Sequence, residues 1–334
     1  MKKLLFLSLI ALGTSCKNGA LISSNSKSDP TQYMKTITAE DLKKHLYIIA
    51  ADSMEGRETG SNGQKKAGRY LISEYQKNQV SFPKGASDFY QAVPASFLNK
   101  KRNNNLPDSE NIWAFIEGTE KPEEVIVISA HYDHVGIENG EIYNGADDDG
   151  SGTSALLEIA QAFQMAKKAG HGPKRSILFL HVTGEEHGLL GSRYYSENPL
   201  FPLANTVADV NIDMIGRRDE LHATTNNYVY IIGANRLSAE LDHISAIMNQ
   251  KYVGLDLDYR FNDPKDPNRF YERSDHYNFA KHGIPSVFFF NGVHADYHKK
   301  SDEAHKIEYD ALEKRTQLAF VVAWELANRK NRIL

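Results

Sequence analysis

The stretch Val125-Ile126-Val127-Ile128-Ser129-Ala130-His131-Tyr132-Asp133-His134 joins an apolar, β-branched run to a group of polar side chains. A run such as residues 125–128 is typical of a strand that is buried on both faces of a parallel sheet. Four further apolar runs predict strands at residues 177–180, 207–212, 228–232 and 287–290. Leu156, Ile159, Ala160 and Phe163 keep helical spacing between two of these strands. Buried strands that alternate with helices predict a three-layer αβα fold of the α/β class, with a mixed, mainly parallel central sheet.

The remaining elements are predicted around this core. Helices are expected from about residue 38 to 49 and over residues 64–77, 236–250 and 309–327, and strands over residues 89–97 and 111–117. The polar connector at residues 256–275 is long and contains proline. Because long irregular connectors inside compact domains often serve a function, we expect this segment to cover a site.

Composition excludes several classes of protein. The chain has 334 residues, of which 41% are hydrophobic and 25% are charged, and this is ordinary globular composition. The formal net charge of −4 gives no basic bias, so nucleic acid is not an expected partner. A single cysteine, Cys16, rules out an intrachain disulfide. Any metal site must therefore use His, Asp and Glu, and thirteen histidines are available.

The N-terminal segment predicts export. Two lysines precede an apolar run at residues 4–12, which is too short to span a bilayer but fits the core of a signal peptide. Small residues then precede Cys16, in a pattern that resembles a bacterial lipoprotein signal. We therefore expect a signal peptide at residues 1–15, then a lipidated cysteine and flexible tether at residues 16–36, and a single domain at residues 37–334. The lipid on Cys16 would be its only membrane attachment, facing the periplasm, with plain secretion as the alternative.

Five polar segments follow predicted strands or lie in loops, and each has an ordinary structural interpretation when taken alone. His131 with Asp133 fits a hydrogen-bonded structural histidine, residues 147–149 fit a helix cap, and Glu185-Glu186 fits an acidic helix start. Taken together they predict one site, because side chains at the carboxyl ends of strands in an open α/β sheet gather at one edge. The combined set is His131, Asp148, Glu186, Asp213 and His298. Nitrogen and oxygen ligands suit zinc, and three carboxylates would neutralise most of the charge of two Zn²⁺ ions.

These segments, in this order, resemble the two-zinc aminopeptidase family. That family includes secreted bacterial aminopeptidases, glutamate-carboxypeptidase-like enzymes, glutaminyl cyclases and the transferrin-receptor ectodomain. The early stretch Ser53-Met54-Glu55-Gly56-Arg57-Glu58-Thr59-Gly60-Ser61 also resembles the N-terminal signature of the family. The resemblance covers residues 37 to 334 and implies a zinc exopeptidase fold.

The resemblance also implies individual roles. His131 would bind the first zinc with Asp133 behind it, and Asp148 would bridge both zinc ions through a loop that holds a cis peptide to Asp149. Glu185 would be the general base. The other ligands would be Glu186, Asp213 and His298, and Tyr297 would steady the carbonyl oxygen of the substrate.

The implied activity is removal of amino acids from peptides that have a free N-terminus. Two alternatives stay open: a glutaminyl cyclase-like acyltransferase that works with one zinc, and a receptor-like binding module that has lost catalysis. A retained His131 argues against the first, and an intact Glu185 argues against the second. A carboxypeptidase would need an arginine cluster, for which Arg217, Arg218 and Arg260 are candidates. The oligomeric state is left undetermined.

Overall fold

An eight-stranded mixed sheet forms the middle layer of the molecule, in the order β1-β2-β6-β3-β7-β10-β8-β9. The computed structural model describes residues 29–100 and 105–333. The predicted signal peptide and Cys16 therefore lie outside the described residues. The strands are β1 (Tyr90–Val93), β2 (Ser109–Ile116), β3 (Lys121–His131), β6 (Arg175–Val182), β7 (Thr206–Ile212), β8 (Tyr228–Ile232), β9 (Asp256–Asp258) and β10 (Ser286–Phe290).

The centre of the sheet is parallel, as the apolar runs predict. Strand β3 lies between β6 and β7, with Ile128 paired to Phe179 on one side and to Val210 on the other. Strand β10 continues the parallel arrangement beside β7. Strands β1 and β2 pair antiparallel with their neighbours, and β8 pairs antiparallel with β10 but parallel with β9. As a result, β3, β6, β7 and β10 end at the same edge of the sheet, where the polar segments begin.

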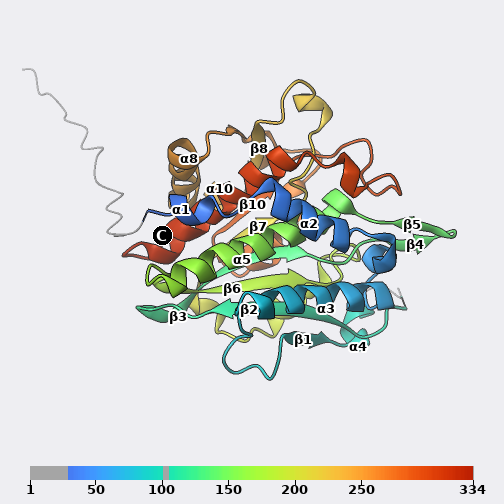
Figure 1. Ribbon diagram of the computed structural model, residues 1–334, viewed down its shortest axis with the longest axis horizontal. Helices are drawn as coiled ribbons and strands as arrows, with labels where there is room; N and C mark the ends of the chain where they lie inside the picture. The colour runs from blue at the N-terminus through green and yellow to red at the C-terminus, as the bar shows by residue number, and fades with distance from the viewer. Residues whose placement is uncertain (1–28, 101–104, 334) are drawn as a thin grey trace, which may run out of the picture.

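Helices cover both faces of the sheet. One face packs against α2 (Ala39–Ile49), α3 (Asn62–Lys77), α5 (Gly152–Lys168) and α10 (Tyr309–Asn328), which lie in front of the strands in Figure 1. The opposite face packs against α6 (Leu190–Glu197) and α9 (His276–Ala280), through Tyr195 and Phe279. The three-layer αβα architecture predicted from the sequence is therefore confirmed. Helix α8 (Ala239–Tyr252) packs beside α10.

Local sequence explains where the first long helices begin. The side chain of Thr38 accepts a hydrogen bond from the backbone N–H of Asp41, which caps α2. The side chain of Ser61 accepts one from the N–H of Gln64 and caps α3 in the same way. Such caps satisfy N–H groups that lack a partner inside the helix. Within the described residues, none of the helices is long and apolar enough to span a membrane.

Several boundaries differ from the prediction. The strand expected at residues 89–97 ends at Val93, because Pro94 leads into the short helix α4 (Ala95–Leu98). The helix expected at residues 236–250 is two helices, α7 (Ala234–Leu237) and α8, separated by an extended Ser238. A hairpin of β4 (Gly136–Glu138) and β5 (Glu141–Tyr143) was not anticipated.

The predicted tether is also too long. Helix α1 (Thr31–Met34) lies inside the range 16–36, yet Tyr33 and Met34 are buried. The ring of Tyr33 stacks on Trp324 of α10, with ring centroids 5.7 Å apart. The packed part of the chain therefore begins before residue 37.

Candidate metal centre

The predicted ligands come from the ends of neighbouring elements. His131 is the last residue of β3, Asp213 follows β7 directly, and Glu186 lies in the loop after β6. His298 lies in the loop after β10, and Asp148 precedes α5. The parallel register of the strands is what brings these distant segments together at one edge.

The side chains form two groups that share Asp148. In the first group, His131 Nε2 lies 3.1 Å from Asp148 Oδ1 and 3.6 Å from Asp213 Oδ1. In the second group, His298 Nε2 lies 3.0 Å from Asp148 Oδ2 and 3.0 Å from Glu186 Oε2. All five predicted ligands thus converge, and the two oxygens of Asp148 face different groups. Zinc binds His nitrogen and carboxylate oxygen, so this donor set fits two zinc ions.

His134 joins the second group and was not predicted to do so. Its Nδ1 lies 2.7 Å from Glu186 Oε1 and 3.9 Å from Asp148 Oδ2, and the side chain is buried. His134, Asp148 and Glu186 are close enough together to hold a metal ion between them. The sequence shows His134 only as a neighbour of Asp133, and nothing in its spacing indicates that it turns toward Glu186.

Asp133 lies behind His131 and contacts it through the backbone more closely than through the side chain. His131 Nδ1 lies 3.1 Å from the backbone carbonyl oxygen of Asp133 but 3.8 Å from its carboxylate. A ring N–H that donates to this carbonyl leaves Nε2 free to bind a metal, so the ring is still oriented by Asp133. The carboxylate instead accepts hydrogen bonds from the Thr59 hydroxyl, at 2.9 Å, and from the backbone N–H of Glu185, at 3.2 Å. Asp133 therefore also positions the predicted base.

The three consecutive aspartates separate in space, and only Asp148 faces the metal ligands. Asp147 accepts the N–H of Gly216 and pairs with His294 Nε2 at 3.1 Å, and Asp149 accepts the N–H groups of Gly152 and Met214. The peptide bond between Asp148 and Asp149 is cis, as the resemblance implies.

Two buried side chains hold this loop from behind. Asp302 accepts the backbone N–H groups of Asp147 and Asp148 through one carboxylate oxygen, at 3.0 and 3.2 Å. Arg57 is fully buried and donates to four backbone carbonyl oxygens, which belong to Ile49, Tyr132, Asn144 and Gly145. Arg57 thereby ties the end of α2 and the end of β3 to the loop that carries Asp148.

The environment shifts the pKa values of the neighbouring Glu185 and Glu186 in opposite directions. Burial raises the pKa of Glu185 well above its usual range, and the nearby carboxylates of Glu186, Asp275 and Asp213 raise it further. For Glu186, burial is outweighed by hydrogen bonds from His134 and His298, which lower its pKa to about 2. Glu185 is therefore suited to hold a proton, and Glu186 is suited to stay ionised.

Asp275 is a second residue that sequence reasoning missed. It is fully buried, and burial raises its pKa to about 7 although the nearby side chain of Ser192 acts in the opposite direction. Its charge acts on Glu185, as noted above, so it belongs to the surroundings of the site. The sequence signal was weak, because Asp275 stands at the end of a polar connector that contains other acids.

A pocket lies beside the predicted metal ligands, two of which line it. Its polar lining is Asp148, Glu185, Asp213, Arg273 and Tyr297, and its apolar lining is Met214, Phe270, Phe288, Phe290 and Val293. The ring of Tyr297 stacks on His298 with centroids 3.9 Å apart, and burial raises the pKa of its hydroxyl. Tyr297 therefore presents a protonated hydroxyl at the pocket.

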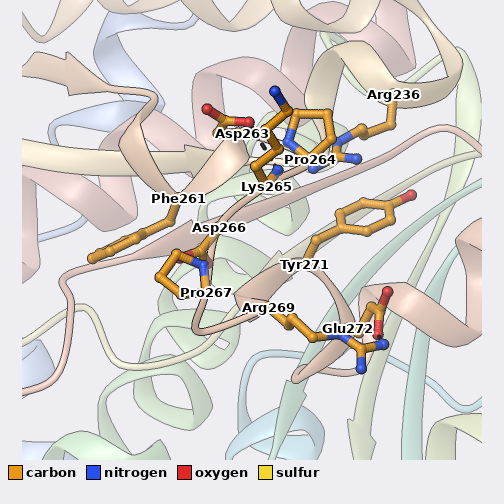
Figure 2. Close-up of a pocket in the computed structure, with 10 residues that line it drawn as sticks. All are labelled: Arg236, Phe261, Asp263, Pro264, Lys265, Asp266, Pro267, Arg269, Tyr271 and Glu272. Carbon is orange, nitrogen blue, oxygen red and sulfur yellow. Dashed lines mark hydrogen bonds and ion pairs between the residues drawn. The ribbon is translucent and has the colours of Figure 1, made fainter.

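The connector at residues 256–275 lines this pocket and also a second cavity. Phe270 and Arg273 reach the first pocket, and residues of the same segment enclose most of a cavity of about 290 Å³. Figure 2 shows this second cavity, with Arg269 and Glu272 paired at its side. None of the predicted metal ligands lines it.

The arginines considered for a carboxypeptidase do not line the pocket beside the metal ligands. Arg217 pairs with Asp296 at 2.9 Å and Arg218 pairs with Glu308 at 2.9 Å. Arg260 is exposed. The pocket has a different arginine, Arg273, which the sequence did not single out.

With this geometry established, the comparisons with known proteins identify the family. The model of peptidase family M28 matches residues 111–323, which is more than half of the chain, so the chain belongs to peptidase family M28. A probable glutamate carboxypeptidase of Arthroderma benhamiae is 38% identical over 130 residues, which cover 37% of this chain and 17% of that protein. Aminopeptidase YwaD of Bacillus subtilis is 24% identical over 335 positions, covering 90% of this chain and 66% of that protein. The chain thus spans only a small part of the first of these relatives.

Solved structures share the fold. The LapA aminopeptidase of Legionella pneumophila aligns with a TM-score of 0.70 and 20% identity, covering 95% of this chain and 79% of that chain. A glutaminyl cyclase of Bacteroides thetaiotaomicron bound to N-acetylhistamine aligns with a TM-score of 0.66 and 18% identity, covering 88% and 99%. Because peptidase and cyclase share this architecture, the fold does not decide between the two activities, and the side chains of the site must do so.

Proposed function

We propose that this protein is a zinc-dependent aminopeptidase that removes single amino acids from the N-terminus of peptides. The observation that carries the proposal is the pair of side-chain groups that share Asp148. His131 and Asp213 would complete one zinc site, and Glu186 and His298 would complete the other. Membership of family M28 supports a peptidase, and similarity to aminopeptidase YwaD supports the N-terminal preference.

The two zinc ions would supply Lewis acidity and a water molecule that ionises near neutral pH. Glu185 would accept a proton from the attacking water and deliver it to the departing amine, because its raised pKa favours the protonated form once the proton has been received. Tyr297 would donate a hydrogen bond to the oxyanion that develops on the substrate carbonyl. Asp133 would hold Glu185 in place through the backbone N–H of that residue.

The free amine of the substrate would be recognised by charge. The pocket contains the carboxylates of Asp148, Glu185 and Asp213, and an α-ammonium group complements them. An N-acetylated peptide lacks this charge and adds an amide that has no partner there. A complete His131 group favours hydrolysis over cyclisation, because a cyclase of this fold is expected to work with one zinc.

The proposal is tested by metal content and by matched peptides. Purified protein should bind two zinc ions per chain and release the first residue of a free peptide, and both chelation and N-acetylation should abolish release. A peptide with N-terminal glutamine is included. One zinc per chain with cyclisation of the glutamine peptide alone would replace the proposal with the cyclase. Two zinc ions without turnover of any peptide would favour a binding module.

We also propose that the protein is exported and held at a membrane by a lipid on Cys16. The support is the sequence pattern at residues 1–16. In a bacterial host, Cys16→Ser should move the protein from the membrane fraction to the soluble fraction. Wild-type protein that is already soluble would contradict this proposal.

A further inference from the structure

We propose that Arg273 selects substrates whose first residue carries a side-chain carboxylate, so that N-terminal glutamate is preferred over its neutral counterpart glutamine. This inference rests on the aminopeptidase activity proposed above and adds the class of residue that the enzyme removes.

Arg273 is held next to the metal ligands by its own backbone. Its N–H donates to the carbonyl oxygen of Phe270 at 3.0 Å. The following residue, Ser274, donates from its hydroxyl to Asp213 Oδ2 at 2.6 Å. Arg273 is thus one residue away from a direct contact with a proposed zinc ligand, and its side chain lines the pocket that contains Asp213 and Glu185.

The guanidinium group of Arg273 has neutral neighbours. It lies 5.0 Å from the centre of the Phe270 ring, and its Nη2 is 3.4 Å from the hydroxyl of Tyr297. No carboxylate of the described residues pairs with it, whereas Arg269, four residues earlier, pairs with Glu272 (Figure 2). An arginine that projects into a pocket without a carboxylate partner can bind an anion through several donors at once.

The charge of the site gives the same conclusion. Arg273 is the one basic residue among those that line the pocket, and the acidic ones are Asp148, Glu185 and Asp213. The α-ammonium group of a substrate would lie beside these acids, and a side-chain carboxylate would lie beside Arg273. Arg273 is exposed to solvent, and the apolar walls beside it include Met214, Phe288 and Phe290, which would contact the methylene groups of a substrate side chain.

The position of the pocket indicates which carboxylate of the substrate Arg273 would bind. Asp148, Glu185 and Asp213 line the pocket and surround the carbonyl that would be attacked. The side chain of the first residue branches from the carbon next to that carbonyl, so it enters this pocket. The C-terminal carboxylate of even a dipeptide lies about 3.5 Å of chain farther on. A glutamate side chain has two methylene groups that could contact the apolar lining and a terminal carboxylate that could pair with Arg273.

The test uses aminoacyl arylamides, which have the same leaving group and no C-terminal carboxylate. Wild-type enzyme should cleave the glutamyl compound with a kcat/KM at least about tenfold above that of the glutaminyl compound, as expected for a hydrogen bond between charged groups. Arg273→Met should bring the glutamyl-to-glutaminyl ratio close to one. Arg273→Glu should shift the preference toward lysyl arylamide. A misfolded variant would lower all rates together, so the ratio separates specificity from structural damage.

Arg269→Met is the matched control, because Arg269 lies outside the pocket and pairs with Glu272. It should keep the wild-type ratio. Equal cleavage of glutamyl and glutaminyl compounds by wild type, or an unchanged ratio in Arg273→Met, would overturn the inference while leaving the aminopeptidase intact. The Arg273→Met change is also measured on a dipeptide and on its C-terminal amide. If it alters only the preference between these two, Arg273 binds the C-terminal carboxylate and the inference is overturned. Failure to cleave any arylamide or free peptide would instead count against the proposed function.

Discussion

Glu185 and Glu186 are adjacent in the chain but lie in different environments. Glu186 contacts two histidines and stays ionised, whereas Glu185 has carboxylates around it and a raised pKa. Adjacent side chains in a loop can point in different directions, so one can bind metal while the other reaches the substrate. The two residues therefore have separable functions.

We predict that Glu186→Ala loses zinc together with activity, because the second group is left with two proposed ligands. Glu185→Gln should keep both zinc ions and lose about two to four orders of magnitude in kcat, which is the usual contribution of a general acid–base group. Zinc content by atomic absorption and kcat on one peptide give both values. Equal zinc loss in the two variants would contradict these roles.

At the scale of residues, the sequence predicted the proposed ligands and missed their surroundings. All five predicted ligands meet in the structure, because their order along the chain and the strand ends before them carry a strong signal. His134 and Asp275 were missed because burial and orientation, rather than residue type, place them at the site. Asp133 contacts His131 through its backbone carbonyl, and two-residue spacing does not distinguish a carbonyl contact from a carboxylate contact.

At the scale of elements, Arg57 joins three parts of the chain that are far apart in the sequence. Its four hydrogen bonds reach the end of α2, the residue after β3 and the turn before Asp148. Asp133, Asp148, Asp149 and Asp302 all contribute favourable charge to it. Removal of the guanidinium would leave buried carbonyl oxygens without a donor.

We predict that Arg57→Met lowers the free energy of unfolding by at least about 3 kcal/mol, because several buried acceptors each lose a partner. Zinc affinity should fall with it, since the Asp148 loop loses its anchor. Urea unfolding and zinc titration measure the two effects. The control is Arg218→Met, whose partly exposed ion pair with Glu308 should be worth less than about 1 kcal/mol. Equal stability of the two variants would be inconsistent with this role of Arg57.

Asp209 in β7 is a buried acid away from the proposed ligands. Ser129 donates to one of its oxygens at 2.8 Å, and the other oxygen has no hydrogen-bond partner among the described residues. Burial raises the pKa of Asp209 well above its usual range. A carboxyl with a raised pKa in the folded state stabilises the fold least at high pH, because the unfolded chain releases the proton first.

We predict that Asp209→Asn is more stable than wild type at pH 8, and that the difference shrinks toward pH 5. Between the unfolded and folded pKa values, wild-type stability falls by about 1.4 kcal/mol per pH unit, and the asparagine removes that fall. Thermal melts of both proteins over this pH range provide the measurement. A difference that does not change with pH would show that Asp209 is ionised in the folded state or pairs with an unseen cation.

Periodicity predicted the central elements well and the peripheral elements less well. Strands β6, β7, β8 and β10 are buried throughout, and β3 is buried from Val125 onward; such runs are recognisable without knowledge of the fold. Residues 89–97 were assigned as one strand although Pro94 ends it, and the hairpin of β4 and β5 has too few apolar residues to give a pattern. Short elements at the rim are set by tertiary contacts, which local sequence does not encode.

At the scale of the whole molecule, the proposed metal centre brings together carboxylates that repel one another. The carboxylates of Asp148, Glu185, Glu186 and Asp213 converge on one edge of the sheet, and repulsion between them must be offset by cations. Two zinc ions would join the ends of β3, β7 and β10 to the loops before α5 and α6. Metal should therefore stabilise the entire domain.

We predict that a chelator lowers the melting temperature and that added zinc restores it. At a free zinc concentration a thousandfold above Kd, one site contributes about 4 kcal/mol to the free energy of unfolding. Differential scanning calorimetry with and without chelator measures the change. Asp148→Ala should remove the response to zinc, and Glu185→Gln should retain it. An unchanged melting temperature in wild type after verified zinc removal would refute the prediction.

The position of α10 has a consequence for how the polypeptide acquires its structure. This helix follows every other element in the chain, yet it packs against α1, α2, α5, α8 and β7 (Figure 1). Trp324 of α10 stacks on Tyr33, which lies near the start of the described residues, and on Phe163 of α5. A nascent chain that ends before residue 309 lacks α10, so the apolar surface that α10 covers is exposed. The apolar residues that α10 covers, Phe163 among them, therefore stay uncovered until residues 309–328 have been synthesised and have packed against them.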